Sequence, residues 1–244
     1  MTTNGPVAVV TGGSRGLGFA LAESLVADGW RVAVDGRDPA VLEDAVRALR
    51  DVAVGAGCDA VKAVVGITGD VADPVHRAAL LAAASALGPV TLLVNNASVL
   101  GPSPLPSLAD YPLDALADVF AVNVTAPLAL IQAVLGDLRR TGGAIINVTS
   151  DAAIEGYPGW GGYGSSKAAL EQLSRVLAAE EPDVRVYWSD PGDMRTAMHQ
   201  EAFPGEDISD RPEPASVVPA LRRLLRQAPP SGRYRAADWQ EVTS

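Results

Sequence analysis

Short apolar runs, many of them rich in β-branched residues, alternate along the chain with longer segments whose apolar positions follow a helical period. A short apolar run bounded by glycine or other turn-forming residues is typical of a buried strand. We therefore expect strands in "PVAVVTG" (6–12), "WRVAVDG" (30–36), "VKAVVGI" (61–67), "VTLLVNNA" (90–97), "GAIINVTS" (143–150), "VRVYWSD" (184–190) and "GRYRAA" (232–237).

The intervening segments predict helices. Two of them open with an aspartate followed by proline, Asp38-Pro39 and Asp73-Pro74, a pair suited to the N-cap and first position of a helix. We expect helices over about 16–29, 38–51, 72–88, 107–121, 123–140, 163–181 and 215–227.

Alternating strands and helices require parallel strand pairs joined by right-handed crossovers, with helices covering both faces of the sheet. The fold class is therefore α/β: a doubly wound parallel sheet of about seven strands. We see no repeat or low-complexity tract and expect one domain over 1–244. Ligands of such sheets bind beyond the carboxyl ends of the strands.

Composition narrows the possible partners. The 244 residues carry a net charge of −10, so a nucleic-acid partner is not expected. Cys58 is the single cysteine, which excludes an internal disulfide. No signal-peptide pattern is evident, and polar residues interrupt the longest apolar segment, so we expect a cytoplasmic protein without a membrane span. His76 and His199 lack companion ligands, so we expect no metal and treat both as ordinary surface or lid residues.

A glycine-rich turn, "TGGSRGLG" (11–18), follows the first strand and leads into the first helix. Gly12, Gly16 and Gly18 would let the backbone turn tightly and approach a pyrophosphate at the helix N-terminus. The spacing G-x-x-x-G-x-G departs from the general dinucleotide-binding pattern. By itself the turn could equally be structural, and its position between strand and helix favours cofactor binding.

The end of the second strand, "VDGRD", normally meets the adenosine ribose of a dinucleotide. It offers both Asp35 and Arg37, and the glycine-rich turn adds Arg15. Two guanidinium groups that clamp a 2′-phosphate would outweigh one carboxylate, which predicts a preference for NADP(H) over NAD(H). The alternative is that Arg37 and Asp38 form a solvated turn.

"YGSSK" places Tyr163 and Lys167 one turn apart on one helical face. A nearby ammonium is expected to lower the pKa of the phenol, so that Tyr163 can exchange a proton with an alcohol oxygen. Ser150, at the end of a predicted strand, could hold the substrate oxygen. The alternative for the Tyr–Lys pair alone is a surface couple, which is the commoner case.

These motifs occur together in a known order. "TGGSRGLG", "DV" (70–71), "NNA" (95–97), "AVNVT" (121–125), "INVTS" (146–150), "YGSSK" and "DPGDMRT" (190–196) resemble the short-chain dehydrogenase/reductase family in sequence and spacing over about residues 6–196. The resemblance implies a Rossmann-type fold and an NADP(H)-dependent oxidoreductase of the carbonyl reductase (ketoreductase) or alcohol dehydrogenase type. Its substrate would be a small ketone, aldehyde or secondary alcohol.

The resemblance also implies individual roles. Asn123, Ser150, Tyr163 and Lys167 look like the catalytic set, in which Asn123 would hold a water in the proton relay to Lys167. Thr11 and Asn95 look like residues that shape the turn and brace the central strand. The implied cofactor-binding residues are Gly12, Ser14, Arg15, Gly16, Leu17, Gly18, Arg37, Asp70, Val71, Asn96, Ala97, Tyr163, Lys167, Pro191, Gly192, Met194 and Thr196.

Two features depart from the family pattern. Ser98 stands where "NNAG" is common, and its side chain would crowd or hydrogen-bond the cofactor. The ending "SGRYRAADWQEVTS" (231–244) replaces the usual glycine-rich one, which puts the commonest tetramer contact in doubt. We still expect a homodimer or homotetramer, with a dimer formed through the helices at 123–140 and 163–181.

The loop at about 193–214 is expected to form a substrate lid, acidic and carrying Met198 and Phe203 as apolar walls. Asp151 and Trp160 are further candidate substrate contacts, whereas Trp188 is expected in the core. Two rival functions stay open: a non-catalytic dinucleotide-binding regulator or scaffold, and dehalogenation of halohydrins. The retained Tyr163 and Lys167 argue against the first, and Lys167 with the glycine-rich turn argues against the second.

Overall fold

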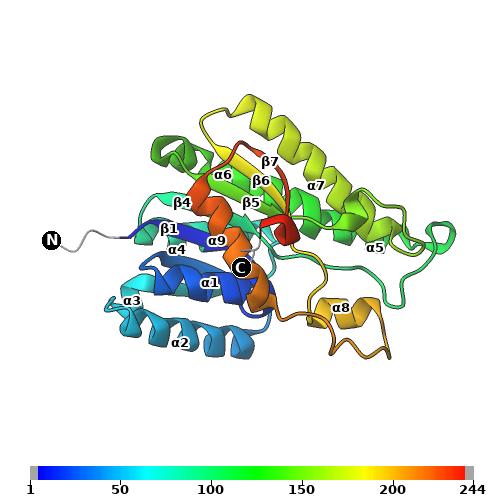
Figure 1. Ribbon diagram of the computed structural model, residues 1–244, viewed down its shortest axis with the longest axis horizontal. Coiled ribbons are helices and arrows are strands. Elements are labelled where there is room, and N and C mark those ends of the chain that lie inside the picture. Colours follow the sequence, from blue (N-terminus) through cyan, green and yellow to red (C-terminus); the bar gives the residue numbers. More distant parts are fainter. Residues whose placement is uncertain (1–4, 240–244) are drawn as a thin grey trace.

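Seven parallel strands form one sheet in the order β3-β2-β1-β4-β5-β6-β7. Figure 1 labels five of them, β1, β4, β5, β6 and β7. The computed structural model describes residues 5–239, so the last five residues of the atypical C-terminal ending lie outside the described part. The strands are β1 (Val7–Val10), β2 (Arg31–Gly36), β3 (Val64–Thr68), β4 (Val90–Asn95), β5 (Ala144–Val148), β6 (Arg185–Asp190) and β7 (Gly232–Arg235). The predicted doubly wound α/β class is confirmed.

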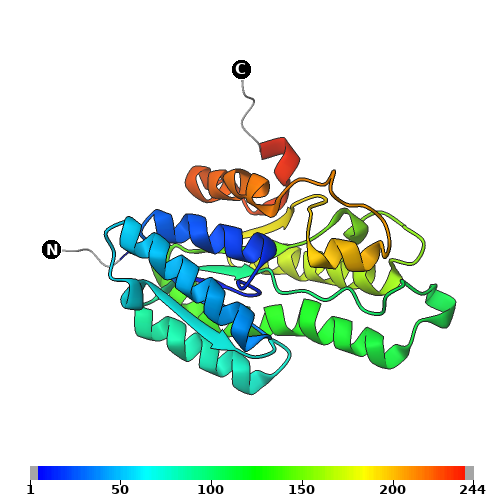
Figure 2. The ribbon, with the colours of Figure 1, turned by 90° about the horizontal axis from the view of Figure 1, so that it is seen from below.

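Helices cover both faces of the sheet (Figure 2). One face packs against α1 (Gly16–Ala27), α2 (Pro39–Gly55) and α9 (Val218–Gln227). The other packs against α4 (Pro74–Leu87), α6 (Ala126–Thr141) and α7 (Gly161–Glu180). Both faces of the strands are therefore apolar, which is why β1 reads as a continuous run in which all four residues are buried.

The predicted aspartate caps of α2 and α4 are confirmed. Asp38 accepts hydrogen bonds from the backbone N–H groups of Ala40 and Val41, and Asp73 accepts one from Val75. In each helix the proline occupies the first turn, where a missing N–H costs nothing. Local chemistry in the sequence thus fixed where both helices begin.

Two predicted boundaries are wrong. Residues 61–63 were expected to begin β3, but they belong to the short helix α3 (Ala60–Ala63), because Asp59 caps the N–H groups of Val61 and Lys62. The helix expected from residue 107 begins only at Leu113, after Pro112, as α5 (Leu113–Phe120). Before it stands the short 3₁₀ turn η1 (Leu108–Asp110).

The break expected between 121 and 123 is a single turn of π-helix, η2 (Ala121–Thr125), which joins α5 to α6 without interruption. Such turns insert one extra residue per turn and are common at functional sites. Asn123 lies in this turn and is buried.

The joined helical run Leu113–Thr141 is long and apolar enough to cross a membrane by length and composition alone. Of its most apolar window, 44% is buried inside the protein, and core helices of soluble proteins pass the same test. The expectation that the chain has no membrane span stays a prediction.

The remaining elements lie around the carboxyl ends of the strands or near the C-terminus. Figure 1 shows α8 (Ala197–Ala202) set apart from the two helical layers. The others are the 3₁₀ turns η3 (Asp151–Ala153), η4 (Pro214–Val217) and η5 (Ala236–Trp239).

A glycine fixes how closely α7 approaches η3. A Cβ atom on Gly164 would lie 2.5 Å from the backbone oxygen of Ala152, whereas a Cβ on Gly136 in α6 would meet nothing within 4 Å. We expect Gly164→Ala to destabilise the protein by about 1–3 kcal/mol through overpacking. Gly136→Ala, the matched control, should stabilise it by about 0.5–1 kcal/mol through helix propensity. Urea unfolding of both variants measures the difference, and equal effects of the two would contradict the close approach.

Candidate active site

One cavity of about 1250 Å³ lies at the carboxyl ends of the strands. It brings together nearly all the site residues expected from the sequence, although these are spread over 187 positions of the chain, from Gly12 to Met198. Three expected residues, Gly18, Asn123 and Phe203, do not line it. The expected residues that do line it are Gly12, Ser14, Arg15, Gly16, Leu17, Arg37, Asp70, Val71, Asn96, Ala97, Ser150, Asp151, Trp160, Tyr163, Lys167, Pro191, Gly192, Met194, Thr196 and Met198.

The glycine-rich turn has the geometry of a phosphate cradle. Gly12 and Gly16 adopt positive φ values of 64° and 59°, which only glycine adopts at little cost. A Cβ on Gly18 would lie 2.4 Å from the oxygen of Gly12, so Gly18 serves the packing of α1 on the turn and not the cavity wall. No side chain caps the N-terminus of α1, and its first turn holds no acidic residue. Its free N–H groups and positive dipole end therefore fit a pyrophosphate.

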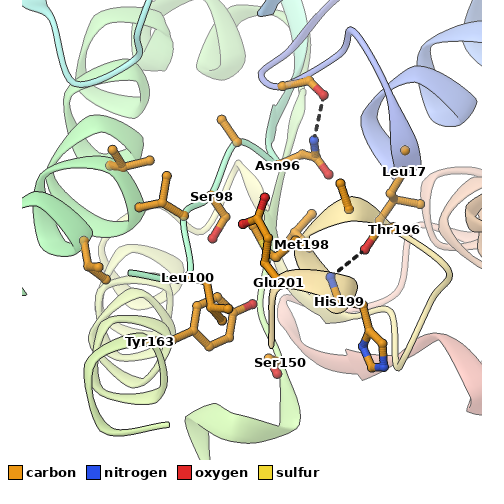
Figure 3. A pocket seen from close by; sticks show the side chains of 18 of the residues that line it. Leu17, Asn96, Ser98, Leu100, Ser150, Tyr163, Thr196, Met198, His199 and Glu201 are labelled. Carbon is orange, nitrogen blue, oxygen red and sulfur yellow. Dashed lines mark hydrogen bonds between the residues drawn. The ribbon is translucent and has the colours of Figure 1, made fainter. Parts of the chain in front are cut away.

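Thr11 and Asn96 fasten this turn to the neighbouring strand. The Thr11 hydroxyl donates to the oxygen of Val94 and accepts from the N–H groups of Asn96 and Ala97. The Asn96 amide donates back to the oxygens of Thr11 and Gly12 (Figure 3). These bonds fasten the glycine-rich turn to the end of β4.

Asp35 and His76 form a buried pair beneath the same turn. One Asp35 oxygen accepts from the N–H of Gly12 at 2.6 Å, and the other lies 2.9 Å from Nε2 of His76. Both side chains are at most 4% exposed. The expectation that His76 is an ordinary surface or lid residue is therefore wrong. It had no local signal, because its partner lies 41 positions away.

Arg15 and Arg37 both line the cavity near the turn and are exposed. Asp70 holds the N–H of Ala72, which keeps the backbone beside Val71 in place at the end of β3. The guanidinium groups of Arg15 and Arg37 can each bind a phosphate through one or two hydrogen bonds.

Tyr163 and Lys167 face the cavity from α7 but are almost completely buried. The Lys167 amine lies 5.4 Å from the centre of the Tyr163 ring and donates to the backbone oxygen of Val148 at 2.9 Å. Burial lowers the pKa of Lys167 to about 7. Burial first, and then the charge of Asp190, raise the pKa of Tyr163 well above its usual value.

The sequence predicted the opposite direction for Tyr163. In the structure the groups that lower its pKa are the hydroxyls of Ser150 and Ser98, and burial outweighs them. A half-protonated amine is a weaker source of positive charge than the full ammonium assumed from the motif. The phenol is therefore held in its neutral, proton-donating form.

Ser150 and Asp151 shape the loop after β5. The Ser150 hydroxyl donates to Asp151 and accepts from the N–H of Ala152. The second oxygen of Asp151 accepts from the Tyr157 hydroxyl at 3.0 Å. Asp151 thus fixes this loop through its own hydrogen bonds and also lines the cavity, and its contact with a substrate stays a prediction.

Asn123 is buried behind the site. Its amide donates to the oxygen of Val99 and to Ser166, and its oxygen accepts from Val99 N–H and from the Ser98 hydroxyl. All the hydrogen-bonding capacity of the side chain is used. The role of Asn123 in holding a relay water stays a prediction. Ser98 donates to Asn123 and also lines the cavity, so its contact with a cofactor stays a prediction too.

The substrate end has apolar walls. Tyr163 clusters with Trp160, Met198 and Phe203, and the Trp160 ring meets Tyr163 edge to face at 5.7 Å. Phe203 packs against Trp160 from behind, outside the cavity lining. His199 lies on α8, where its N–H is capped by Thr196. Glu201 extends from α8 toward Ser98 (Figure 3), and Trp188 lies in the core as expected.

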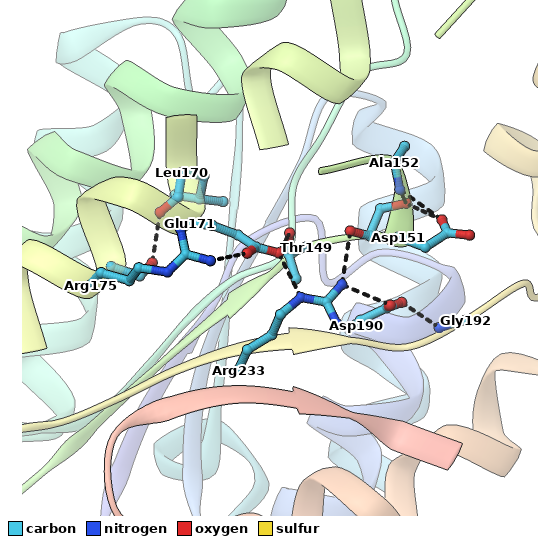
Figure 4. Close-up of polar contacts among 11 residues, drawn as sticks. Thr149, Asp151, Ala152, Leu170, Glu171, Arg175, Asp190, Gly192 and Arg233 are labelled. Atoms are coloured by element: carbon cyan, nitrogen blue, oxygen red, sulfur yellow. Dashed lines mark hydrogen bonds and ion pairs between the residues drawn. The ribbon is translucent and has the colours of Figure 1, made fainter. Parts of the chain in front are cut away.

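Sequence reasoning missed three charged groups directly behind the site. Arg233 of β7 contacts Glu171 of α7 and Asp190 of β6, and all three are buried or nearly so (Figure 4). Asp190 begins the "DPGDMRT" motif, but nothing in that motif indicates its partner, because the contacts join residues 43 and 62 positions apart.

The sheet order, the glycine cradle and the Tyr–Lys pair define an oxidoreductase of the dinucleotide-binding α/β class. The family model for short chain dehydrogenases matches residues 6–207. The chain belongs to the short-chain dehydrogenase/reductase family.

Similar proteins agree in fold and family. The bovine (Bos taurus) dehydrogenase/reductase SDR family member 4 is 38% identical, over 79% of this chain and 67% of its own length. The cis-1,2-dihydrobenzene-1,2-diol dehydrogenase of Pseudomonas putida is 35% identical, over 98% and 82%. The alcohol dehydrogenase of Thermococcus sibiricus, solved with 5-hydroxy-NADP, has a TM-score of 0.82 at 28% identity, with 94% of this chain and 95% of that chain covered.

The buried His76 predicts a pH-dependent stability. The hydrogen bond with Asp35 is the main cause that raises the pKa of His76 above 6.5, and the charges of Asp35, Asp70 and Asp73 add to it. The stabilising contribution of His76 to the free energy of unfolding is therefore complete below pH 6.5, and it is lost as the pH rises through the higher pKa that His76 has in the folded protein. His76→Gln, which keeps a donor without titrating, should lose this dependence, and His76→Leu should cost about 1.5–3 kcal/mol.

Urea unfolding between pH 5.5 and 9 measures the effect, with His199→Gln as the control at the chain's other histidine. Lys167, whose pKa is lowered, makes stability rise with pH above about 7 in every variant, so the difference between wild type and variant isolates His76. A constant difference between wild type and His76→Gln across this range would contradict the pair.

Proposed function

We propose that the protein catalyses reversible hydride transfer between NADP(H) and a ketone, aldehyde or secondary alcohol, with Tyr163 as the general acid and base. The observation that supports this most directly is that the buried Tyr163–Lys167 pair and the glycine-rich turn face one cavity. When bound, the nicotinamide cofactor supplies or accepts the hydride. The protein provides binding, orientation and the proton.

Two ends of the cavity would bind the two halves of the dinucleotide cofactor. The N–H groups of the glycine-rich turn and of α1 receive the pyrophosphate, and Arg15 and Arg37 select the 2′-phosphate. Asp35 contributes little to this selection, because its side chain is 2% exposed and is held by Gly12 and His76. Pro191, Gly192, Met194 and Thr196 line the other end, where the nicotinamide carboxamide would be held.

The proton moves through Tyr163. Since burial keeps the phenol neutral, it can donate to the oxygen of a carbonyl held by Ser150 and Tyr163 together. The Lys167 amine, with a pKa of about 7, can accept or return a proton near neutral pH. In its protonated form the amine stabilises the phenolate. The two groups interact closely, so the pH profile reports the pair.

The walls indicate the class of substrate. Leu100, Trp160, Met198 and Ala202 are apolar, and the carboxylates of Asp151 and Glu201 stand at the same end. Such a site favours a neutral or cationic carbonyl compound with an apolar body over a carboxylate. We propose that the segment at 193–214, which carries α8, covers this substrate as a lid.

The remaining expectations are also proposals. We propose a cytoplasmic homodimer or homotetramer that uses α6 and α7, and neither a nucleic acid nor a membrane as partner. The apolar Val176 on α7, 43% exposed, supports a contact there.

The proton role predicts a large loss of turnover in Tyr163→Phe. We expect kcat to fall by about 10²- to 10⁴-fold, because the substrate oxygen then has no positioned proton donor, while NADPH binding stays near normal. NADPH oxidation with a panel of ketones and aldehydes measures kcat, and tryptophan fluorescence measures NADPH binding. Tyr157→Phe, at the exposed tyrosine bonded to Asp151, is the control and should change kcat little. Wild-type turnover in Tyr163→Phe would refute the role.

The cofactor preference predicts a selective effect of Arg37→Gln. Loss of a charge-assisted bond to the 2′-phosphate should lower kcat/KM for NADPH about 10- to 100-fold and leave that for NADH nearly unchanged. Arg47→Gln, at an exposed arginine farther along α2, is the matched control. A wild-type enzyme with a higher kcat/KM for NADH would show that the preference is assigned wrongly.

A further inference from the structure

Arg233 forms three polar contacts, each to a different segment of the candidate site (Figure 4). Its Nε donates to Oε1 of Glu171 at 2.9 Å. Its Nη2 donates to Oδ2 of Asp190 at 3.0 Å and to the backbone oxygen of Ser150 at 3.2 Å. A planar guanidinium is suited to this, because its donors point in fixed and divergent directions.

Each of the three segments carries a group with a proposed role in turnover. Glu171 lies on α7, one helical turn beyond Lys167, and its Oε1 also accepts from the Thr149 hydroxyl. Asp190 ends β6, and its other oxygen accepts from the N–H of Gly192 at 3.0 Å. Ser150 contributes the hydroxyl proposed to hold the substrate oxygen. The Arg233 side chain therefore joins three segments through its hydrogen bonds: α7, which carries Tyr163 and Lys167, the loop at Ser150, and the loop at 191–196.

The burial of this cluster gives the contacts weight. The side chains of Glu171 and Asp190 are 1% and 6% exposed, and that of Arg233 is 18% exposed. Two carboxylates so far from water need a cation to balance them. Arg175 also contacts Glu171, through Oε2 at 3.0 Å, but its side chain is 47% exposed and only Arg233 reaches Asp190 among the contacts described.

The same cluster acts on the phenol. Asp190 and Asp151 are the charges that raise the pKa of Tyr163. Of the two carboxylates, Asp190 has the larger effect on this pKa, and Arg233 contacts Asp190 directly, so its positive charge offsets that effect. Lys167, above the Tyr163 ring, is the other cation near the phenol, and its own pKa is lowered by burial.

We propose that Arg233 is a positioning residue for hydride and proton transfer, which sets the relative places of Tyr163, Ser150 and the 191–196 loop and balances the charge of Asp190 beside the phenol. This inference rests on the proposed function and adds to it a residue from the last strand. It also gives a role to the C-terminal ending that departs from the family pattern: "GRYR" supplies the arginine.

The experiment compares wild type with Arg233→Met, Arg233→Lys and the matched control Arg175→Met, which removes the exposed arginine from the same glutamate. For each protein, kcat and KM for one carbonyl substrate, the Kd for NADPH, the melting temperature and the pH profile of kcat for reduction are measured. Wild-type turnover is measured first.

We expect Arg233→Met to lower kcat about 10- to 100-fold, with a much smaller change in KM and in the Kd for NADPH, since the reacting groups are displaced while the binding surfaces remain. The pH at which kcat for reduction falls to half should move upward, because the charge of Asp190 is no longer balanced. Arg233→Lys keeps the charge but not the three directed bonds. It should keep the wild-type pH profile with a lowered kcat, and Arg175→Met should match wild type in both.

A lowered melting temperature with unchanged kcat and pH profile in Arg233→Met would mean a purely structural role and would overturn the inference. If Arg233→Met does not fold, Arg233→Lys decides: a lowered kcat at near-normal melting temperature supports the inference, and a wild-type kcat overturns it. A wild-type protein without turnover would overturn the proposed function and this inference together, whereas an active wild type with an equally active Arg233→Met overturns the inference alone.

Discussion

The burial of the Lys167 amine beside the Tyr163 phenol is the constraint around which the rest of the site is built. An amine with 2% exposure has lost most of its hydration, and one backbone oxygen, that of Val148, replaces part of it. The consequence is a lysine that titrates near pH 7 and a phenol that stays neutral. A pair in this state is suited to passing one proton, because the phenol keeps its proton until a substrate oxygen accepts it, and the amine gains or loses one near neutral pH.

Such a pair needs rigid surroundings, and these come from buried polar groups behind the cavity. Beneath the glycine-rich turn, Asp35 accepts a hydrogen bond from Gly12 and contacts His76. Near Ser150, Glu171 and Asp190 accept hydrogen bonds from Thr149 and Gly192 and are joined by Arg233. In both places a buried carboxylate accepts hydrogen bonds from loop groups while a cationic or ionisable partner balances it. Loops fixed in this way can present backbone N–H groups without collapsing onto them.

The elements themselves were largely predictable, because apolar runs and aspartate–proline caps are local signals. The strands and the two capped helices follow from segments of a few residues each, whereas most residues of the cavity wall were implied by the resemblance to the family. The errors arose where one local signal overrode another. The apolar run 61–67 resembles a strand throughout, yet the Asp59 cap turns its first residues into a helix. Likewise Pro112 delays α5, and a π-helical turn continues the chain where a break was expected.

The partners of His76 and Arg233 were not predictable for a different reason. Neither residue belongs to a motif, and each acquires its role only when the sheet order brings distant segments together: β2 next to β3 and α4, and β7 next to β6. The direction in which the pKa of Tyr163 shifts was missed for the same reason. The motif shows that Lys167 lies one turn away on the same helix, but it does not show how deeply the phenol is buried.

The pair beneath the glycine-rich turn also bears on how the cofactor is chosen. A carboxylate near the end of the second strand usually indicates recognition of a free ribose hydroxyl. Here each oxygen of Asp35 already has one partner within the protein, and its side chain is 2% exposed, so little of the carboxylate is accessible to a ribose. The exposed groups at that end of the cavity include Arg15 and Arg37. In "VDGRD", Asp35 therefore holds the glycine-rich turn, whereas Arg37 is exposed and lines the cavity. This arrangement, which the sequence alone does not give, supports the proposed preference for NADP(H).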